Sequence, residues 1–358
     1  MKRLFLKGAA LLASSWNALG ANPPSAMRMV APGKAVIGWA QPDIRDTEGT
    51  NSWDEFETAM AANHEGLKLI YQIVDYPTLD FNLDYQAGAD KTLFVTLAAE
   101  KRAAQALAAE ALDNLHRGNS DSAVKNVSTM LALVNETTND RTVISELVRI
   151  AIAQIVMPVT WELLQSTNIT EAQMTNIQGC WLRLEFIRPI KNALLMERTT
   201  SGITIAEWRD SSSEFQKYFN RWESIEDSVQ KVTMVDRLTI KTSGLMWRYW
   251  WSYPDESRLL KGDQVLLDTV RSLQTSYSFL PAERRQAAEL QNLLFRTNEE
   301  TQFLGDPREL DMHSIFSSSI PSLGRILDKV VKVEVAKQMV VTAIALDWVW
   351  PEWHLDSA

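Results

Sequence analysis

The chain has very few of the residues that hold metals or form cross-links. Among its 358 residues are one cysteine, Cys180, and four histidines, at positions 64, 116, 313 and 354. A single cysteine permits no intramolecular disulfide and no cysteine-based zinc cage. No histidine lies three to five residues from another, so the helical zinc-binding pair is absent. We expect no metal and no cofactor, although a metal site assembled from distant residues stays open.

Glycine and proline are also scarce, with 14 and 12 copies, and this disfavours an architecture of strands and turns. The chain lacks a glycine-rich phosphate loop, a dinucleotide fingerprint and the Gly-x-Ser-x-Gly motif of serine hydrolases. Its net charge is −9, and no basic run contains interleaved aromatic residues. We therefore expect no nucleic-acid partner, because such binding depends on clustered Lys and Arg.

Helical periodicity, by contrast, runs through most of the chain. From Leu97 to Leu115 apolar residues recur on one face, and alanine, the best helix former, fills much of the rest. Gly118 is expected to end this helix, and Asn119 or Ser120 to cap a second helix that reaches Val134. The predicted fold class is all-α, an irregular multi-helix bundle or helical-hairpin array around a central apolar helix.

That central helix is expected over residues 142–165, after an N-cap at Asp140. Between Arg149 and Thr160 its one polar side chain is Gln154, which indicates a helix buried on nearly every side. The apolar run is about half of the roughly 20 residues that a bilayer span needs. Pro158 is expected to kink the helix. Glu146 and Arg149, three residues apart at its entry, favour an ordinary ion pair and are also the first place to look for a polar pocket.

The composition divides the chain into four stretches. Residues 1–21 form a possible signal or anchor segment and residues 22–51 a proline-containing linker. Residues 52–200 and 201–358 form N-terminal and C-terminal helical regions that we expect to pack as one continuous domain. A helix is predicted from Met174 through Ile187 towards Leu195, and a break over residues 201–205.

The first 21 residues begin with Lys2 and Arg3, continue with a short apolar stretch and contain small residues near their end. This pattern is typical of a secretory signal, with cleavage after Gly20 or Ala21. We therefore expect an exported or envelope-associated protein, with membrane association through the N-terminus. The alternative is an ordinary N-terminal helix in a cytoplasmic protein.

The chain also has 13 tryptophans, an unusually large number. Trp247, Trp250 and Trp251 cluster with Tyr249, and another group lies near the C-terminus. Aromatic residues at helical spacing are usually core, and the alternative is an exposed interaction patch. If exposed, Trp247, Tyr249, Trp250 and Trp251 are the residues we expect to contact a partner.

Two resemblances follow from these residues. Ala108, Leu115, Gly118 and Ala123 are spaced as in a tetratricopeptide-type hairpin, although no second copy follows at about 34 residues. More broadly, the chain resembles an uncharacterised family of predominantly helical, envelope-associated bacterial proteins of the planctomycete and verrucomicrobial type. The phrases that carry this resemblance are MAANHEGLKLIYQIVD, LDFNLDY, LHRGNSDSA, TVISELVRIAIAQIVMPVTWELLQ and LRLEFI, at residues 60–75, 79–85, 115–123, 142–165 and 182–187. The resemblance implies a helical envelope protein and supplies no catalytic residue.

Three functions are compatible with the sequence. We favour a non-enzymatic scaffolding protein of the bacterial envelope that binds protein or peptide through a helical groove. The alternative is a hydrolase or lipid-handling enzyme with a pocket beside residues 142–165, using Glu146, Arg149 or His116. The third is a structural domain whose ligand the sequence does not show. Convergent buried polar groups with shifted pKa values would favour the enzyme, and a concave apolar surface without them would favour binding.

Overall fold

The computed structural model describes residues 66–72, 83–88, 97–166, 168–217, 242, 244–276, 278–295 and 315–349. Across these ranges the chain is helical and contains no strand, which confirms the predicted all-α class. The predicted signal segment and the linker lie outside the described residues, as do Trp350 and Trp353 near the C-terminus.

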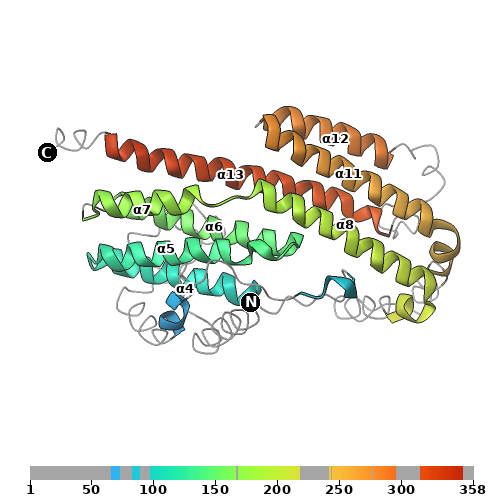
Figure 1. Cartoon of the computed structure of the whole chain (residues 1–358), viewed down its shortest axis with the longest axis horizontal. Coiled ribbons are helices and arrows are strands. Elements are labelled where there is room, and N and C mark those ends of the chain that lie inside the picture. The colour runs from blue at the N-terminus through green and yellow to red at the C-terminus, as the bar shows by residue number, and fades with distance from the viewer. Residues whose placement is uncertain are drawn as a thin grey trace, which may run out of the picture. The chain divides into compact units, whose positions relative to one another are not determined.

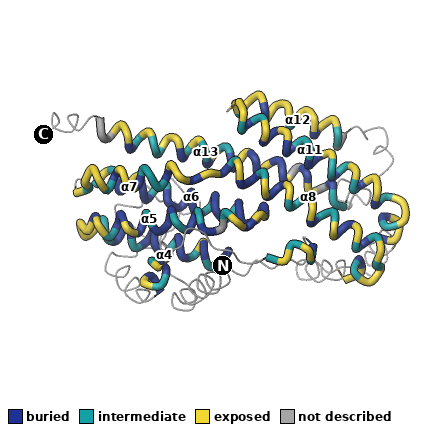
Figure 2. The backbone as a smooth tube through the Cα atoms, viewed as in Figure 1, coloured by how far each residue is buried: buried dark blue, intermediate teal, exposed yellow. Residues whose placement is uncertain are grey.

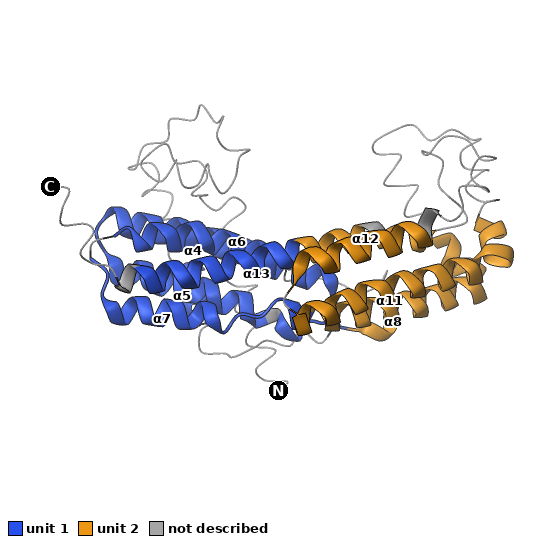
Figure 3. Ribbon diagram, turned by 90° about the horizontal axis from the view of Figure 1, so that it is seen from above, with its two compact units in different colours: residues 1–83, 94–189, 329–358 blue, residues 84–93, 190–328 orange. Residues whose placement is uncertain are grey.

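The chain divides into two compact units (Figure 3). Unit 1 comprises residues 1–83, 94–189 and 329–358, and unit 2 comprises residues 84–93 and 190–328. The division runs through two continuous helices, α8 (Ile187–Asp210) and α13 (Ile320–Val349). The predicted regions 52–200 and 201–358 do not coincide with these units, because the C-terminal helix returns to unit 1.

Three helices form the centre of unit 1 (Figure 1). They are α4 (Leu97–His116), α5 (Ser120–Glu136) and α6 (Val143–Leu164), and each contacts the other two. The buried residues of α4 are largely alanines, whose small side chains let neighbouring helices approach closely. Helical residues 66–72 add the buried Leu67 and Ile70 to the same core.

Local sequence signals account for the ends of these helices. Gly118 has a positive φ of 73°, and the Asn119 side chain accepts a hydrogen bond from the Ser122 backbone N–H at 3.3 Å. At the start of α6 the predicted cap is wrong. Thr142, not Asp140, accepts from the Ser145 N–H at 3.2 Å. Asp140 is buried two residues earlier, where it accepts a hydrogen bond from the Ser145 hydroxyl instead.

α6 is the most apolar helix of the described residues. Its buried residues are dark blue in Figure 2. It is the one helix of the described part that is long and apolar enough to cross a bilayer, with a mean hydropathy of 1.6 over its most apolar 18 residues. Of that window, 67% is buried inside the protein. This burial is the pattern expected of a core helix, as predicted.

α7 (Glu171–Leu182) and the later part of α13 complete unit 1. α7 begins with a reciprocal capping box. Thr170 accepts from the Gln173 N–H, and the Gln173 side chain accepts from the Thr170 N–H at 2.8 Å. α13 lies beside α7, since the Gln178 amide donates to the Val341 carbonyl at 3.1 Å.

The predicted continuous helix from Met174 to Leu195 is wrong, because four residues separate α7 from α8. Pro189 explains the break. Proline has no N–H to donate to the carbonyl four residues earlier, that of Glu185, and it is tolerated in the first turn of a helix. The freed carbonyls are taken by other helices: Arg149 donates to Glu185 O at 3.0 Å and Lys337 to Leu184 O at 2.9 Å.

Unit 2 contains α8 from Ile190, the π-helix η6 (Trp247–Trp251), α11 (Ser252–Ser276), α12 (Phe279–Phe295) and the first turns of α13. The predicted break over residues 201–205 is wrong, since α8 continues through it to Asp210. α11 packs closely on the start of α13: a Cβ built on Gly262 would lie 2.4 Å from the Ile320 side chain. Glycine is therefore required at that crossing.

Candidate functional site

The aromatic cluster around Trp247 is half core and half surface. The Trp247 ring is fully buried and packs against three other aromatic rings, those of Trp208, Phe215 and Phe316. Its indole N–H donates to Asp255 at 2.9 Å. Burial therefore removes Trp247 from the expected contact residues and makes it part of the core of unit 2.

Asp255 organises this core. Its carboxylate is fully buried and also accepts from the Phe316 N–H at 2.9 Å, the Ser317 N–H at 3.0 Å and the Ser317 hydroxyl at 2.7 Å. With the bond from Trp247 these are four hydrogen bonds, which satisfy both carboxylate oxygens. The chain leading into α13 is thus pinned to the first turn of α11.

The next residues of the cluster point to solvent. Tyr249 is 68% exposed, Trp250 66% and Tyr253 67%, and Trp251 is intermediate. The rings of Tyr249 and Trp250 make an edge contact with centroids 6.4 Å apart. A π turn holds one more residue than an α turn and so shifts the phase of the side chains around it. We call Tyr249, Trp250 and Tyr253 the aromatic face.

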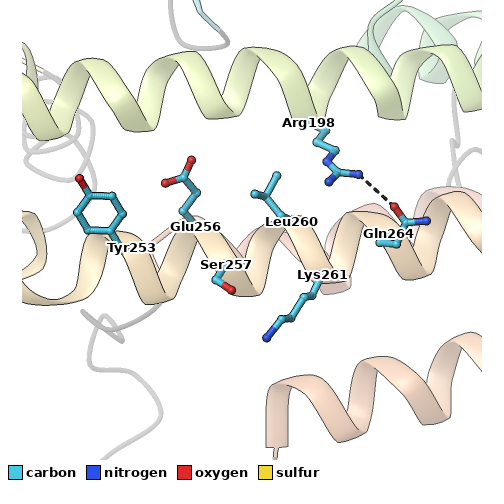
Figure 4. A pocket seen from close by; sticks show the side chains of 7 residues that line it. All are labelled: Arg198, Tyr253, Glu256, Ser257, Leu260, Lys261 and Gln264. Atoms are coloured by element: carbon cyan, nitrogen blue, oxygen red, sulfur yellow. Dashed lines mark hydrogen bonds between the residues drawn. The ribbon is translucent and has the colours of Figure 1, made fainter.

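A cleft of about 400 Å³ adjoins the aromatic face in unit 2 (Figure 4). We call it the α8–α11 cleft. Its lining consists of Arg198 from α8 and six residues of α11: Tyr253, Glu256, Ser257, Leu260, Lys261 and Gln264. Tyr249, Tyr253, Ser257 and Lys261 recur at four-residue spacing, so the aromatic face and the cleft share one side of the same continuous helix.

Two arginines connect α8 to α11 along the cleft. Arg198 donates to the Gln264 side chain at 3.2 Å, the bond dashed in Figure 4. Eleven residues later in α8, Arg209 pairs with Glu256 at 2.5 Å. The Arg209 guanidinium also lies over the Tyr253 ring, 3.6 Å from its centroid. The helices therefore run antiparallel here, and Tyr253 is held in place although its ring is exposed.

Two carboxyl groups lie near Arg198 without lining the cleft. Burial raises the pKa of Asp263 to about 7, while the charge of Arg198 opposes this rise and that of Glu197 adds to it. One oxygen of Asp263 has no hydrogen-bond partner among the described residues. Burial also raises the pKa of Glu197. In both groups burial disfavours the charged carboxylate, and the charge of Arg198 opposes this effect at Asp263.

Glu146 and Arg149 form a closed ion pair in α6. The guanidinium donates to Glu146 at 2.6 Å, to the Val134 carbonyl at 2.7 Å and to the Glu185 carbonyl, and both side chains are buried. Burial raises the pKa of Glu146 to about 7 against the opposing effect of Arg149. His116 is exposed in the last turn of α4 and is not among the partners of Arg149. The pair therefore joins three segments of unit 1, and neither side chain is accessible to solvent.

Other titratable groups of unit 1 were not indicated by sequence patterns. Burial, followed by the negative charge of Glu100, raises the pKa of Glu136 to about 8. The Tyr71 hydroxyl donates to Glu110 and contacts the Asn126 side chain, and the Lys125 ammonium lies 3.9 Å from the Tyr71 ring centroid. Among the described residues, no three His, Cys, Asp or Glu side chains are grouped closely enough to hold a metal ion. Cys180 has intermediate exposure.

The cleft residues Arg198, Glu256 and Lys261 were missed as well. A usable signal was the four-residue repeat from Tyr249 to Lys261, which continues the aromatic cluster along one helix face. No sequence pattern indicated the α8 side of the cleft, because we expected a break over residues 201–205, within what is α8.

No family model, curated protein or solved structure matches this chain. The resemblance to a family of bacterial envelope proteins therefore stays a prediction, and the argument for function depends on the geometry of this chain.

Proposed function

We propose that this chain is a non-enzymatic, helical protein- or peptide-binding protein that uses the aromatic face of unit 2. The observation that supports this function is the exposure of Tyr249, Trp250 and Tyr253, each about two thirds, beside a cleft of about 400 Å³. Tyrosine and tryptophan dominate binding energy at protein interfaces, because they bury a large rigid surface at little cost in conformational entropy. The neighbouring Leu245 and Met246 are exposed too and extend the apolar area.

The enzyme alternative has less support. Glu146 and Arg149 are buried and paired with each other, whereas a general acid or base needs access to a substrate atom. The carboxyl groups with raised pKa values in unit 1 are the remaining observation in favour of it. Raised values also occur in structural networks, so by themselves they do not indicate an active site.

We further propose that the protein acts at the bacterial envelope. Support comes from the basic start, the apolar stretch and the small residues of the first 21 positions. Sequencing the N-terminus of the native protein after cell fractionation tests this proposal. An unprocessed Met1 in the cytoplasmic fraction would contradict it.

Site-specific photocrosslinking tests the binding proposal. Benzoylphenylalanine replaces Trp250 in one variant, and in the control it replaces Leu280, a residue of α12 in the same unit that is 63% exposed. After irradiation of native cells we expect an adduct of discrete mass at position 250 and none at position 280. The crosslinked protein, identified by mass spectrometry and purified, should bind the wild-type chain and bind Trp250→Ala at least about tenfold more weakly.

Equal crosslinking at both positions, or no loss of affinity in Trp250→Ala, would overturn the proposed function. Trp250→Ala is expected to fold normally, because the side chain projects into solvent. Far-ultraviolet circular dichroism checks this before any affinity is compared.

A further inference from the structure

We infer that the α8–α11 cleft binds acidic side chains of a peptide partner, with Arg198 and Lys261 as the residues that determine this specificity. The inference rests on the proposed function and adds the chemistry of the partner. It begins from the charges of the cleft, which differ in sign from the charge of the whole chain.

The cleft contains two cations that form no ion pair among the described residues. Arg198 donates to the neutral amide of Gln264, and within the described ranges it has no ion pair. Lys261 is exposed and likewise has no ion pair in the described part of the chain. Glu256, the one acid of the lining, is neutralised by Arg209. On a chain of net charge −9 this local excess of positive charge attracts an anionic partner.

The dimensions favour a peptide over a single small anion. Tyr249 and Gln264 are fifteen positions apart on one continuous helix, which at 1.5 Å per residue is about 22 Å. An extended peptide of about seven residues covers that length. Its apolar or aromatic side chains would lie on Tyr249 and Trp250, and its carboxylates would lie at the end near Arg198 and Lys261 (Figure 4).

Several side chains of the cleft are also preorganised for a ligand. Arg209 binds Glu256 and stacks on Tyr253, so those groups need little ordering when a partner arrives. Arg198 uses one nitrogen for Gln264 and keeps other N–H groups for a carboxylate. On α8, a Cβ built on Gly202, four residues after Arg198, meets nothing within 4 Å.

Selection from a random dodecamer peptide display library tests the inference on the full chain. We expect the wild type to enrich peptides with net negative charge and at least one aromatic residue. The double variant Arg198→Gln/Lys261→Gln should lose the acidic bias and bind the best acidic peptide about tenfold more weakly, equal to about 1.4 kcal/mol. Raising the salt concentration from 50 to 500 mM should weaken the wild type and hardly affect the variant.

A control variant changes the net charge equally away from the cleft. Arg188→Gln/Lys217→Gln removes two exposed cations that pair with Glu185 and Glu214 in surface ion pairs, and it should keep the acidic bias. Enrichment without an acidic bias would overturn this inference and leave the proposed function standing. No enrichment of any peptide would overturn both. Acidic enrichment that survives in the cleft variant would assign the charge effect to another surface.

Vesicles containing phosphatidylserine provide the competing macromolecule. If the vesicles bind the wild type but not the Arg198→Gln/Lys261→Gln variant, and if they displace the selected peptides, the partner is an anionic lipid surface and the peptide assignment fails. We expect no vesicle binding that depends on Arg198 or Lys261.

Discussion

Removing the Arg149 side chain should destabilise unit 1 and loosen the link between α7 and α8. The guanidinium makes one bond to the Glu146 carboxylate and two to backbone carbonyls, those of Val134 and Glu185. Arg149→Met fills a similar volume but leaves the buried Glu146 carboxylate and Val134 carbonyl without this donor, together with the part-buried Glu185 carbonyl. An unsatisfied buried acceptor costs about 1–3 kcal/mol, and breaking a buried ion pair costs about 3–5 kcal/mol.

We expect Arg149→Met to lower the free energy of unfolding of unit 1 by about 4 kcal/mol, near the middle of that range. The pKa of Glu146, already raised to about 7, rises further without its partner, so the carboxyl protonates rather than remaining charged. The double variant Glu146→Gln/Arg149→Met should recover about 1–2 kcal/mol of the loss, because no uncompensated acid remains.

Urea unfolding with pulse-labelling hydrogen exchange measures unit 1 separately from unit 2. Peptides from α4, α5 and α6 report its stability, and peptides over residues 183–190 report the link that Arg149 holds. The matched control is Arg188→Met, which breaks an exposed ion pair with Glu185 and should change stability by less than about 1 kcal/mol. If Arg149→Met changed stability as little as this control, the guanidinium would not be holding the break, and the reasoning would be refuted.

Three further predictions concern other positions. Because the pKa of Glu136 is raised in the folded protein, the unfolded chain releases the Glu136 proton at lower pH, and unit 1 should lose stability as the pH rises from about 5 to about 8. In urea unfolding, Glu136→Gln should remove about 3 kcal/mol of that loss. A pH dependence that is unchanged in this variant would contradict the prediction. Asp255→Asn replaces one acceptor oxygen by a donor facing N–H groups, and should cost about 2–4 kcal/mol in unit 2 with faster hydrogen exchange at residues 316–319. Gly202→Ala should stabilise α8 by about 0.5–1 kcal/mol, measured as a higher urea midpoint, because the added methyl group meets no atom; a destabilised variant would show that the space is occupied.

Local sequence signals predicted several helix ends correctly. Gly118 was expected to end α4 and does so with a positive φ, and Asn119, one of the two expected caps, accepts the Ser122 N–H at the start of α5. These features depend on atoms within a few residues of one another, so a sequence pattern contains nearly all the information needed. The apolar character of residues 142–165 likewise determined that this helix is central, because burying it is the favourable outcome in water.

The candidate site was predicted only in part. The aromatic cluster was identified, and Tyr249 and Trp250 are exposed as a contact surface requires, but Trp247 is core. The sequence does not distinguish these neighbouring aromatic residues. The π-helix directs Trp247 towards Phe215 and Phe316, and it directs Tyr249 and Trp250 towards solvent. The cleft depends on α8 lying alongside α11, which no spacing within either helix indicates.

The sequence by itself determined the helical class, the central helix and several caps of this protein, because short-range hydrogen bonds and hydrophobic periodicity specify them. Tertiary structure decided how the break over residues 183–186 is held, because Arg149 and Lys337 supply donors to carbonyls that Pro189 helps to free. It also decided which aromatic residues face solvent and which cations remain unpaired beside them. Those outcomes depend on contacts between segments tens to more than a hundred residues apart, and such contacts leave no periodic trace in the chain.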